Sequence, residues 1–149
     1  MFTVTASEVT HWLESYYDAW CQADAEAASR LFEVDATYSE SPYEPGWPTG
    51  KRMTGRGQIA EYWHRVTVEL SRFIDGGFDL WAVRGDKAFA RWWADAELRG
   101  EGYWVEAEGI LRLTFVDRLG EQLVCQELLE WNPAIPASHH HNEVHRADQ

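Results

Sequence analysis

The chain has 149 residues, about the length of one domain, and its 45% hydrophobic and 26% charged residues are ordinary for a globular protein. Its formal net charge is −12, and Lys51 and Lys87 are its only lysines, so it lacks the basic footprint that binds nucleic acid or an anionic membrane. Because there is no run of about 20 apolar residues and no signal-like start, we expect a soluble, cytoplasmic protein with neither kind of partner.

Three helices are predicted in the first half of the chain. Residues 5–8 form a capping box, and apolar residues then recur at three- and four-residue steps, which predicts a helix over 7–22. Asp24 is a typical N-cap for a second, short helix, and strand character follows over 35–41. The apolar spacing predicts a third helix over 57–71.

The segment 42–57, before the third helix, is broken by three prolines and four glycines, which predicts a loop. It carries two aromatic residues, Tyr43 and Trp47. Long loops in compact domains often form lids or pocket rims, so we expect this loop to border a binding site.

After the third helix the hydrophobic period becomes two. Strands are predicted over 78–83, 88–98 and 103–115, joined by short turns, and a last strand ends near Trp131. Short turns between strands favour an antiparallel meander, so the predicted fold class is α+β: three helices, then the meander.

We take 1–133 as a single domain and 134–149 as a disordered tail. The tail holds His139–His141 and His145 without a cysteine or carboxylate pattern, which indicates adventitious metal binding and not a metal site. No phosphate-loop or dinucleotide-binding motif is complete, so no cofactor is predicted.

The two faces of the predicted sheet differ in character. One face is apolar and small, with Ala88, Ala90, Ala94, Ala96 and Ala107. Small side chains leave space that the third helix and the loop can close over, which is the usual geometry of a ligand pocket. The other face is rich in Trp and Arg, as interfaces are, and we expect it to form a homodimer through Phe89, Arg91, Trp93 and Trp104. The alternative is a solvated face with cross-strand ion pairs, and a single bulge would exchange the two faces.

Several short motifs follow one another in a fixed order over residues 7–132. They are Asp18–Asp24, Leu31–Phe32, Asp35–Tyr38, Pro42, Gly55–Ile59, Tyr62–Trp63, Gly109–Ile110, and Phe115 before the turn at Gly120. In order and spacing the chain resembles the nuclear-transport-factor-2-like superfamily, in particular its SnoaL-like polyketide-cyclase and ketosteroid-isomerase branch. The resemblance implies a cone-shaped, commonly dimeric fold, with a curved antiparallel sheet wrapped around the long N-terminal helix. It leaves the function open, because this fold hosts isomerases, cyclases, dehydratases, epoxide hydrolases and non-catalytic binders.

The same resemblance implies candidate catalytic residues. Glu40 occupies the position of the general-base aspartate of ketosteroid isomerase, and Tyr16 that of its oxyanion-hole tyrosine. A carboxylate in an apolar pocket can carry a proton between carbons beside a carbonyl, and a buried phenol can donate to the developing enolate. The protonated acid of the isomerase aligns with Leu111, so one donor is missing, which argues against strict ketosteroid isomerase activity. The alternative is that Glu40 is a rim carboxylate and Tyr16 a core phenol.

The leading hypothesis is therefore cofactor-free acid–base chemistry, namely isomerisation, cyclisation or dehydration, on a hydrophobic carbonyl compound, with Glu40 and Tyr16 as the catalytic residues. The predicted ligand-binding residues are Trp20, Tyr38, Tyr43, Trp63, Trp92, Tyr103 and Leu111. Two alternatives stay open: a non-catalytic binding module for a small apolar metabolite, and a structural dimerisation domain whose pocket is filled by its own side chains.

Overall fold

The computed structural model describes residues 1–41, 52–100, 102–131 and 138–141. Three α-helices and a π-helical segment (η1) accompany seven strands within these residues. In chain order the elements are α1 (Ala6–Cys21), α2 (Ala25–Ser29), β1 (Phe32–Ser41), β2 (Arg52–Thr54), α3 (Arg56–His64), η1 (Arg65–Leu70), β3 (Ser71–Arg84), β4 (Lys87–Leu98), β5 (Tyr103–Leu119), β6 (Gln122–Trp131) and β7 (Ser138–His141).

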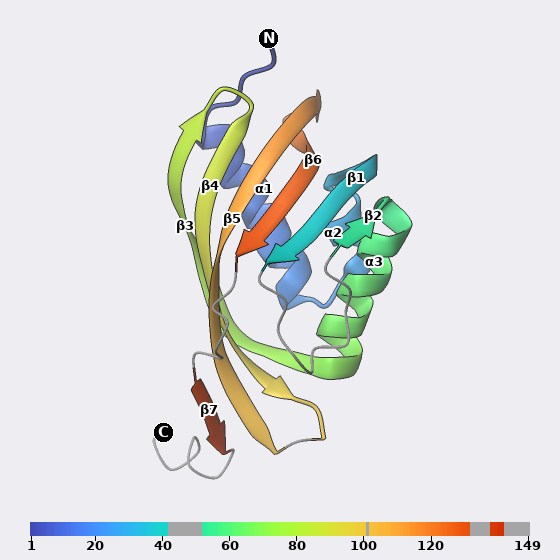
Figure 1. Ribbon diagram of the computed structural model, residues 1–149, viewed down its shortest axis with the longest axis vertical. Helices are drawn as coiled ribbons and strands as arrows, with labels where there is room; N and C mark the ends of the chain where they lie inside the picture. The colour runs from blue at the N-terminus through green and yellow to red at the C-terminus, as the bar shows by residue number, and fades with distance from the viewer. Residues whose placement is uncertain (42–51, 101, 132–137, 142–149) are drawn as a thin grey trace.

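The strands form one curved, unclosed sheet in the order β2-β1-β6-β5-β4-β3, with β7 paired to β5. Neighbouring strands are antiparallel, except that β1 and β6 run parallel. The sheet curves around α1, while α3 packs against α2, β1 and β2 (Figure 1). This architecture confirms the predicted α+β class. Among the described residues, no helix combines the length and the apolar character that crossing a membrane requires.

α1 begins at the predicted capping box and supplies the centre of the core. The Thr5 side-chain oxygen accepts from the Glu8 backbone N–H at 3.1 Å, and the Glu8 carboxylate accepts from the Thr5 backbone N–H at 3.0 Å. One turn further on, Trp12 is fully buried, and its indole N–H donates to the Leu31 carbonyl at 3.2 Å. Its ring stacks on that of Tyr16 with 5.0 Å between centroids. The helix therefore carries its aromatic face into the curve of the sheet.

The alanine face of the sheet is the inner face. Ala88 and Ala90 are fully buried in the core, and Ala94 is nearly so. β4 pairs with β5 along its whole length without a register shift, so the alternation predicted for β4 is kept and no bulge exchanges its faces. Small inner side chains allow α1 and the aromatic residues around it to approach this part of the sheet.

Two of the differences from the predicted elements lie between residues 42 and 84. Within the predicted loop, residues 42–51 lie outside the described residues, and Arg52–Thr54 form β2 by pairing with β1. β3 begins at Ser71 instead of residue 78. Residues 71–77 lack apolar alternation, but their backbones pair with β4. Backbone pairing with a neighbouring strand, which needs no side-chain pattern, explains both differences.

A short strand lies within the segment predicted as a tail. Residues 138–141 form β7 and pair with Tyr103–Glu106 of β5. Tyr103–Glu106 of β5 pair with β4 along one edge only. The backbone N–H and C=O groups of the other edge can pair with a short strand whatever its sequence. The rest of the segment lies outside the described residues.

Candidate functional site

Five side chains from four elements form what we call the tyrosine–glutamate cluster: Tyr16 of α1, Tyr38 and Glu40 of β1, Tyr62 of α3, and Glu130 of β6. The Tyr38 hydroxyl donates to a carboxylate oxygen of Glu130 at 2.7 Å, and the Tyr16 hydroxyl donates to that of Tyr38 at 3.4 Å. Tyr16, Tyr38 and Glu130 are buried. Tyr62 is partly exposed as a residue, but its hydroxyl lies inside, and its ring is 5.2 Å from that of Tyr38.

The sheet register brings the two glutamates together. β1 and β6 pair in parallel with Glu40 opposite Glu130, so both side chains point to the same face. Tyr38 lies two residues before Glu40 on β1 and shares that face, which explains how its hydroxyl reaches Glu130. Glu130 is only 6% exposed, and Glu40 is partly buried.

The phenols of the cluster are neutral hydrogen-bond donors. Burial raises the pKa of Tyr16 and of Tyr38 well above the usual value for tyrosine, and the neighbouring Glu130 charge raises both pKa values further. Burial also raises the pKa of Tyr62, followed by the effect of the Glu40 charge. Ionising any of these phenols beside the carboxylates is therefore unfavourable, and each keeps its proton to donate to a neighbour or to a ligand.

A row of three predicted ligand-binding tryptophans continues from the cluster. The Trp63 ring lies 5.0 Å from the Tyr16 ring and 6.1 Å from that of Trp20. Trp20 in turn lies 5.6 Å from Trp92, which projects from the inner face of β4. The contacts are edge-on, the arrangement that aromatic quadrupoles favour.

Two of these indoles carry an unused donor. The N–H groups of Trp63 and Trp92 are buried and make no hydrogen bond to any residue that the structure describes. A buried donor without an acceptor is costly, because it has lost its bonds to water and gained none in return. Such a donor is satisfied when a ligand brings an oxygen or nitrogen acceptor to it.

Three predicted ligand-binding residues remain, and the structure describes the side chain of only one of them. Leu111 is buried on β5 and pairs directly with Glu130 of β6. Leu111 aligns with the protonated carboxylic acid of ketosteroid isomerase, and in this protein the carboxyl group beside that position comes from Glu130. Tyr103 begins β5 and pairs with Leu98, but its side chain lies outside the described set. Tyr43 lies outside the described residues.

The residues predicted to form a dimer face are largely engaged within the chain. Arg91 forms ion pairs with Asp79 at 3.3 Å and with Glu108 at 2.8 Å, as in the alternative of cross-strand ion pairs. Trp104 is only 7% exposed. Phe89 and Trp93 are partly buried.

Sequence reasoning missed Glu130 and Tyr62 as site residues. The alternation Leu128–Glu130 marks Glu130 as an inward position of β6, because Leu128 is fully buried. That signal gains meaning only once β6 is known to lie beside β1, a parallel pairing between distant segments that local patterns do not reveal. Tyr62 sits next to Trp63 on α3, and its place in the helix pattern and in the family motif Tyr62–Trp63 does not mark it as a partner of Glu40.

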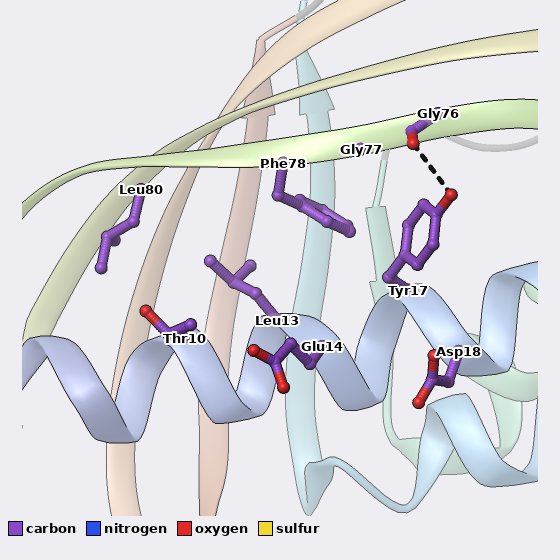
Figure 2. A pocket seen from close by; sticks show the side chains of 9 residues that line it. All are labelled: Thr10, Leu13, Glu14, Tyr17, Asp18, Gly76, Gly77, Phe78 and Leu80. Atoms are coloured by element: carbon purple, nitrogen blue, oxygen red, sulfur yellow. Dashed lines mark hydrogen bonds between the residues drawn. The ribbon is translucent and has the colours of Figure 1, made fainter.

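A separate hollow, the α1–β3 groove, lies between the first helix and the edge strand. It has a volume of about 440 Å³ and is lined by Thr10, Leu13, Glu14, Tyr17, Asp18, Gly76, Gly77, Phe78 and Leu80 (Figure 2). The Tyr17 hydroxyl crosses it to donate to the Gly76 carbonyl at 2.8 Å. None of the predicted site residues whose side chains the structure describes lines it. Across the described ranges, no group of three or more His, Cys, Asp or Glu side chains is placed to hold a metal ion.

Comparisons with known proteins bear on this architecture. The sequence pattern of the SnoaL-like domain family matches residues 13–120. No curated protein matches the sequence. Among solved structures, a ketosteroid isomerase-like protein from Erwinia carotovora atroseptica superposes with a TM-score of 0.64 at 16% identity, over 85% of this chain and 94% of that one.

Two further structures share the architecture. A nuclear transport factor 2-like superfamily protein from Salmonella enterica has a TM-score of 0.64 at 19% identity, over 87% of this chain and 91% of that one. An LEH-like epoxide hydrolase from M. tuberculosis has a TM-score of 0.63 at 12% identity, over 85% and 84%. The match over most of the described chain shows that the protein belongs to the SnoaL-like domain family and has the cone fold of the nuclear-transport-factor-2-like superfamily.

Proposed function

We propose that the protein is a cofactor-independent acid–base enzyme that acts on a hydrophobic carbonyl compound. The observation that carries the proposal is the tyrosine–glutamate cluster, where Glu40 and Tyr16 come together with two more phenols and a second carboxylate. Ionisable groups of this kind in a buried setting are the usual equipment of proton-transfer sites.

In the proposed reaction Glu40 removes a proton from the carbon next to the carbonyl. Tyr16 donates a hydrogen bond to the oxygen on which negative charge develops. Its bond to Tyr38 is long at 3.4 Å, whereas Tyr38 is held to Glu130 at 2.7 Å, so the Tyr16 proton is the easier one to redirect to a substrate. The phenol remains neutral because its pKa is raised by burial.

The apolar part of the substrate would lie along Trp20, Trp63 and Trp92. The row begins next to Tyr16, and the unsatisfied indole N–H groups of Trp63 and Trp92 favour a ligand with a further acceptor atom. Solved structures of similar fold include a ketosteroid isomerase-like protein and an epoxide hydrolase, whose names agree with small-molecule chemistry in this fold. A family of many functions does not by itself select one.

Exchange of the α-protons of the hydrophobic ketone α-tetralone for deuterium in D₂O, followed by proton NMR, tests the proposal. Glu40→Gln keeps the shape of the side chain but not the base, so exchange should fall by about 10²–10⁴-fold. Binding, followed by tryptophan fluorescence, should change only a few-fold. Glu33→Gln on the same strand is the matched control and should exchange like wild type. Exchange that survives in Glu40→Gln would remove Glu40 from the mechanism.

The unsatisfied indole donors also support the second function, a non-catalytic binding module for a small apolar metabolite. This alternative predicts saturable quenching of tryptophan fluorescence by one of a panel of apolar ketones, phenols and lactones. It also predicts no exchange or product, and no effect of Glu40→Gln on binding. The two measurements together therefore separate the two functions.

A further inference from the structure

The α1–β3 groove has no role in the proposed acid–base chemistry. Its volume of about 440 Å³ lies within the range of about 300–1,000 Å³ that is usual for small-molecule sites. One wall is α1 and the other is the edge strand β3 (Figure 2). None of the five residues of the tyrosine–glutamate cluster lines the groove. A molecule held in the groove would therefore leave the cluster free.

The groove has an apolar, partly aromatic lining. Leu13 of α1 is buried, and Phe78 and Leu80 reach from β3 toward the helix (Figure 2). The ring of Phe78 meets the ring of Tyr17 edge to face, with 5.8 Å between their centroids. Aliphatic and aromatic groups of this kind favour an apolar ligand, and the faces of aromatic rings also attract ammonium ions.

Tyr17 bridges the two walls of the groove. Its hydroxyl donates to the Gly76 carbonyl at 2.8 Å, so its ring and not its hydroxyl is available to a ligand. Burial raises the pKa of Tyr17 to about 12, followed by the effects of Cys21 and of the Asp75 and Asp18 charges. The phenol therefore stays neutral, and the negative charge of neighbouring carboxylates acts on this end of the groove.

The charged residues that line the groove are all acidic. Glu14 and Asp18 are four residues apart on α1 and so lie on the same face of the helix. No basic side chain lines the groove, and neither carboxylate forms an ion pair within the described part of the chain. Like charges at this spacing destabilise a helix, and a cation bound between them would remove that repulsion. The net charge of −12 adds a long-range attraction for cations.

We propose that the α1–β3 groove is a second ligand site, which binds a small organic ammonium ion with an apolar body. The ammonium group lies at Glu14 and Asp18, and the apolar body lies against Leu13, Phe78 and Leu80. The acidic lining repels an anion, and a neutral apolar molecule leaves the two carboxylates unpaired. A hydrated metal ion gains nothing from the apolar lining, and the described residues place no three metal-ligating side chains together. The inference does not depend on the proposed function.

Two probes of nearly the same shape test the proposal, the phenethylammonium ion and the neutral phenethyl alcohol. Each is titrated into the ¹⁵N-labelled protein, and amide shifts are followed by two-dimensional NMR. The amides of Gly76 and Gly77 lie on the β3 wall and report occupation of the groove directly. The ammonium ion should shift both amides in a saturable way. The alcohol should bind at least about 5-fold more weakly, because it lacks the charge that the carboxylates and the rings attract.

Removing one charge at a time locates the ammonium group. Glu14→Gln and Asp18→Asn should each weaken binding of phenethylammonium by about 2–5-fold and leave binding of phenethyl alcohol unchanged. Both positions are exposed, so the variants should fold, which circular dichroism checks. Glu61→Gln, at an exposed position of α3, removes the same charge away from the groove and should change neither affinity. Added salt should weaken binding of the ammonium ion but not of the alcohol.

Four results would each overturn the proposal. Equal affinity for the ion and the alcohol would make the groove merely apolar. Shifts that spare Gly76 and Gly77 would place the ion elsewhere on the protein, and the absence of any saturable shift would show that it does not bind. Weakening by Glu61→Gln as large as that by Glu14→Gln and Asp18→Asn would assign the binding to the net charge of the chain. None of these results bears on the acid–base chemistry proposed for the cluster.

Discussion

At the scale of single residues, the hydroxyl of Tyr38 organises the tyrosine–glutamate cluster. It donates to Glu130 at 2.7 Å and accepts from Tyr16, so it fixes the position of one carboxylate and one phenol at once. The sequence predicted Tyr38 as a ligand contact, whereas the structure gives its hydroxyl a partner in the protein. Tyr16 and Glu40 could be proposed from a family resemblance. Glu130 could not, because its neighbour Tyr38 is 92 residues away in sequence.

Tyr38→Phe should therefore destabilise the protein measurably. The change removes the hydroxyl and leaves a buried carboxyl oxygen of Glu130 with one hydrogen bond fewer, at a cost of about 1–3 kcal/mol. Urea unfolding followed by circular dichroism gives the free energy of unfolding. Tyr17→Phe, which loses a neutral hydrogen bond to Gly76 at a partly buried position, is the control and should cost about 0.5–1.5 kcal/mol. A free energy of unfolding for Tyr38→Phe equal to that of wild type would show that the cluster bond does not stabilise the fold.

At the scale of elements, one glutamate both starts α1 and ties it to the sheet. Glu8 closes the capping box with Thr5, and its carboxylate also bonds the guanidinium of Arg118 near the end of β5. Arg118 also donates to the Thr3 carbonyl at 2.6 Å. Residues 5–8 and the apolar spacing after them predicted the helix, because a capping box is a local signal. The tie to Arg118 spans 110 residues and has no local signature.

This tie should make part of the stability depend on pH. The hydrogen bond from Arg118 lowers the pKa of Glu8 to about 2, against an ordinary value of 4.5. A carboxylate whose pKa is lower in the folded state stabilises the fold above its unfolded pKa, and this contribution is lost as the pH falls. Glu8→Gln should therefore unfold at lower urea concentration than wild type at pH 7, and the difference should shrink between about pH 4.5 and pH 2.

Urea midpoints across this pH range check the prediction. Glu14→Gln, an exposed position on the same helix, is the control and should stay close to wild type. High salt should weaken the Glu8 effect, because the pair is at the surface. A Glu8→Gln difference that stayed constant down to pH 2 would assign the effect to the cap geometry instead of the charge.

At the scale of the whole molecule, local patterns predicted the helices, the antiparallel meander and the inner alanine face. They did not predict β2, the early start of β3 or the parallel β1–β6 pairing. These features depend on backbone pairing between segments whose side chains carry no strong alternation or lie far apart in sequence. The candidate site depends on the parallel pairing of β1 with β6. The fold was therefore more predictable from the sequence than the site.

We still propose that the outer face of the sheet forms a dimer, but with Ile110 and Trp131 at the centre of the interface. Ile110 and Trp131 pair across β5 and β6 and are 37% and 41% exposed, whereas Arg91 and Trp104 are engaged within the chain. Analytical ultracentrifugation should find a dimer, and Ile110→Glu or Trp131→Glu should dissociate it by placing a charge in a buried interface. Leu119→Glu, at the exposed β5–β6 turn, should leave it intact. A monomeric wild type would reject the proposed dimer.

The parallel pairing of β1 with β6 also determines when the cluster forms during synthesis. The β3–β4 and β4–β5 pairs join neighbouring segments, so they can form while β6 is still being made. β1 leaves the ribosome early, yet its parallel partner is the last of the long strands. Until then a nascent chain has Tyr38 and Glu40 without Glu130, so the tyrosine–glutamate cluster is incomplete. The acid–base chemistry proposed for the cluster thus begins only after the chain has folded through β6, which keeps partly made copies inactive.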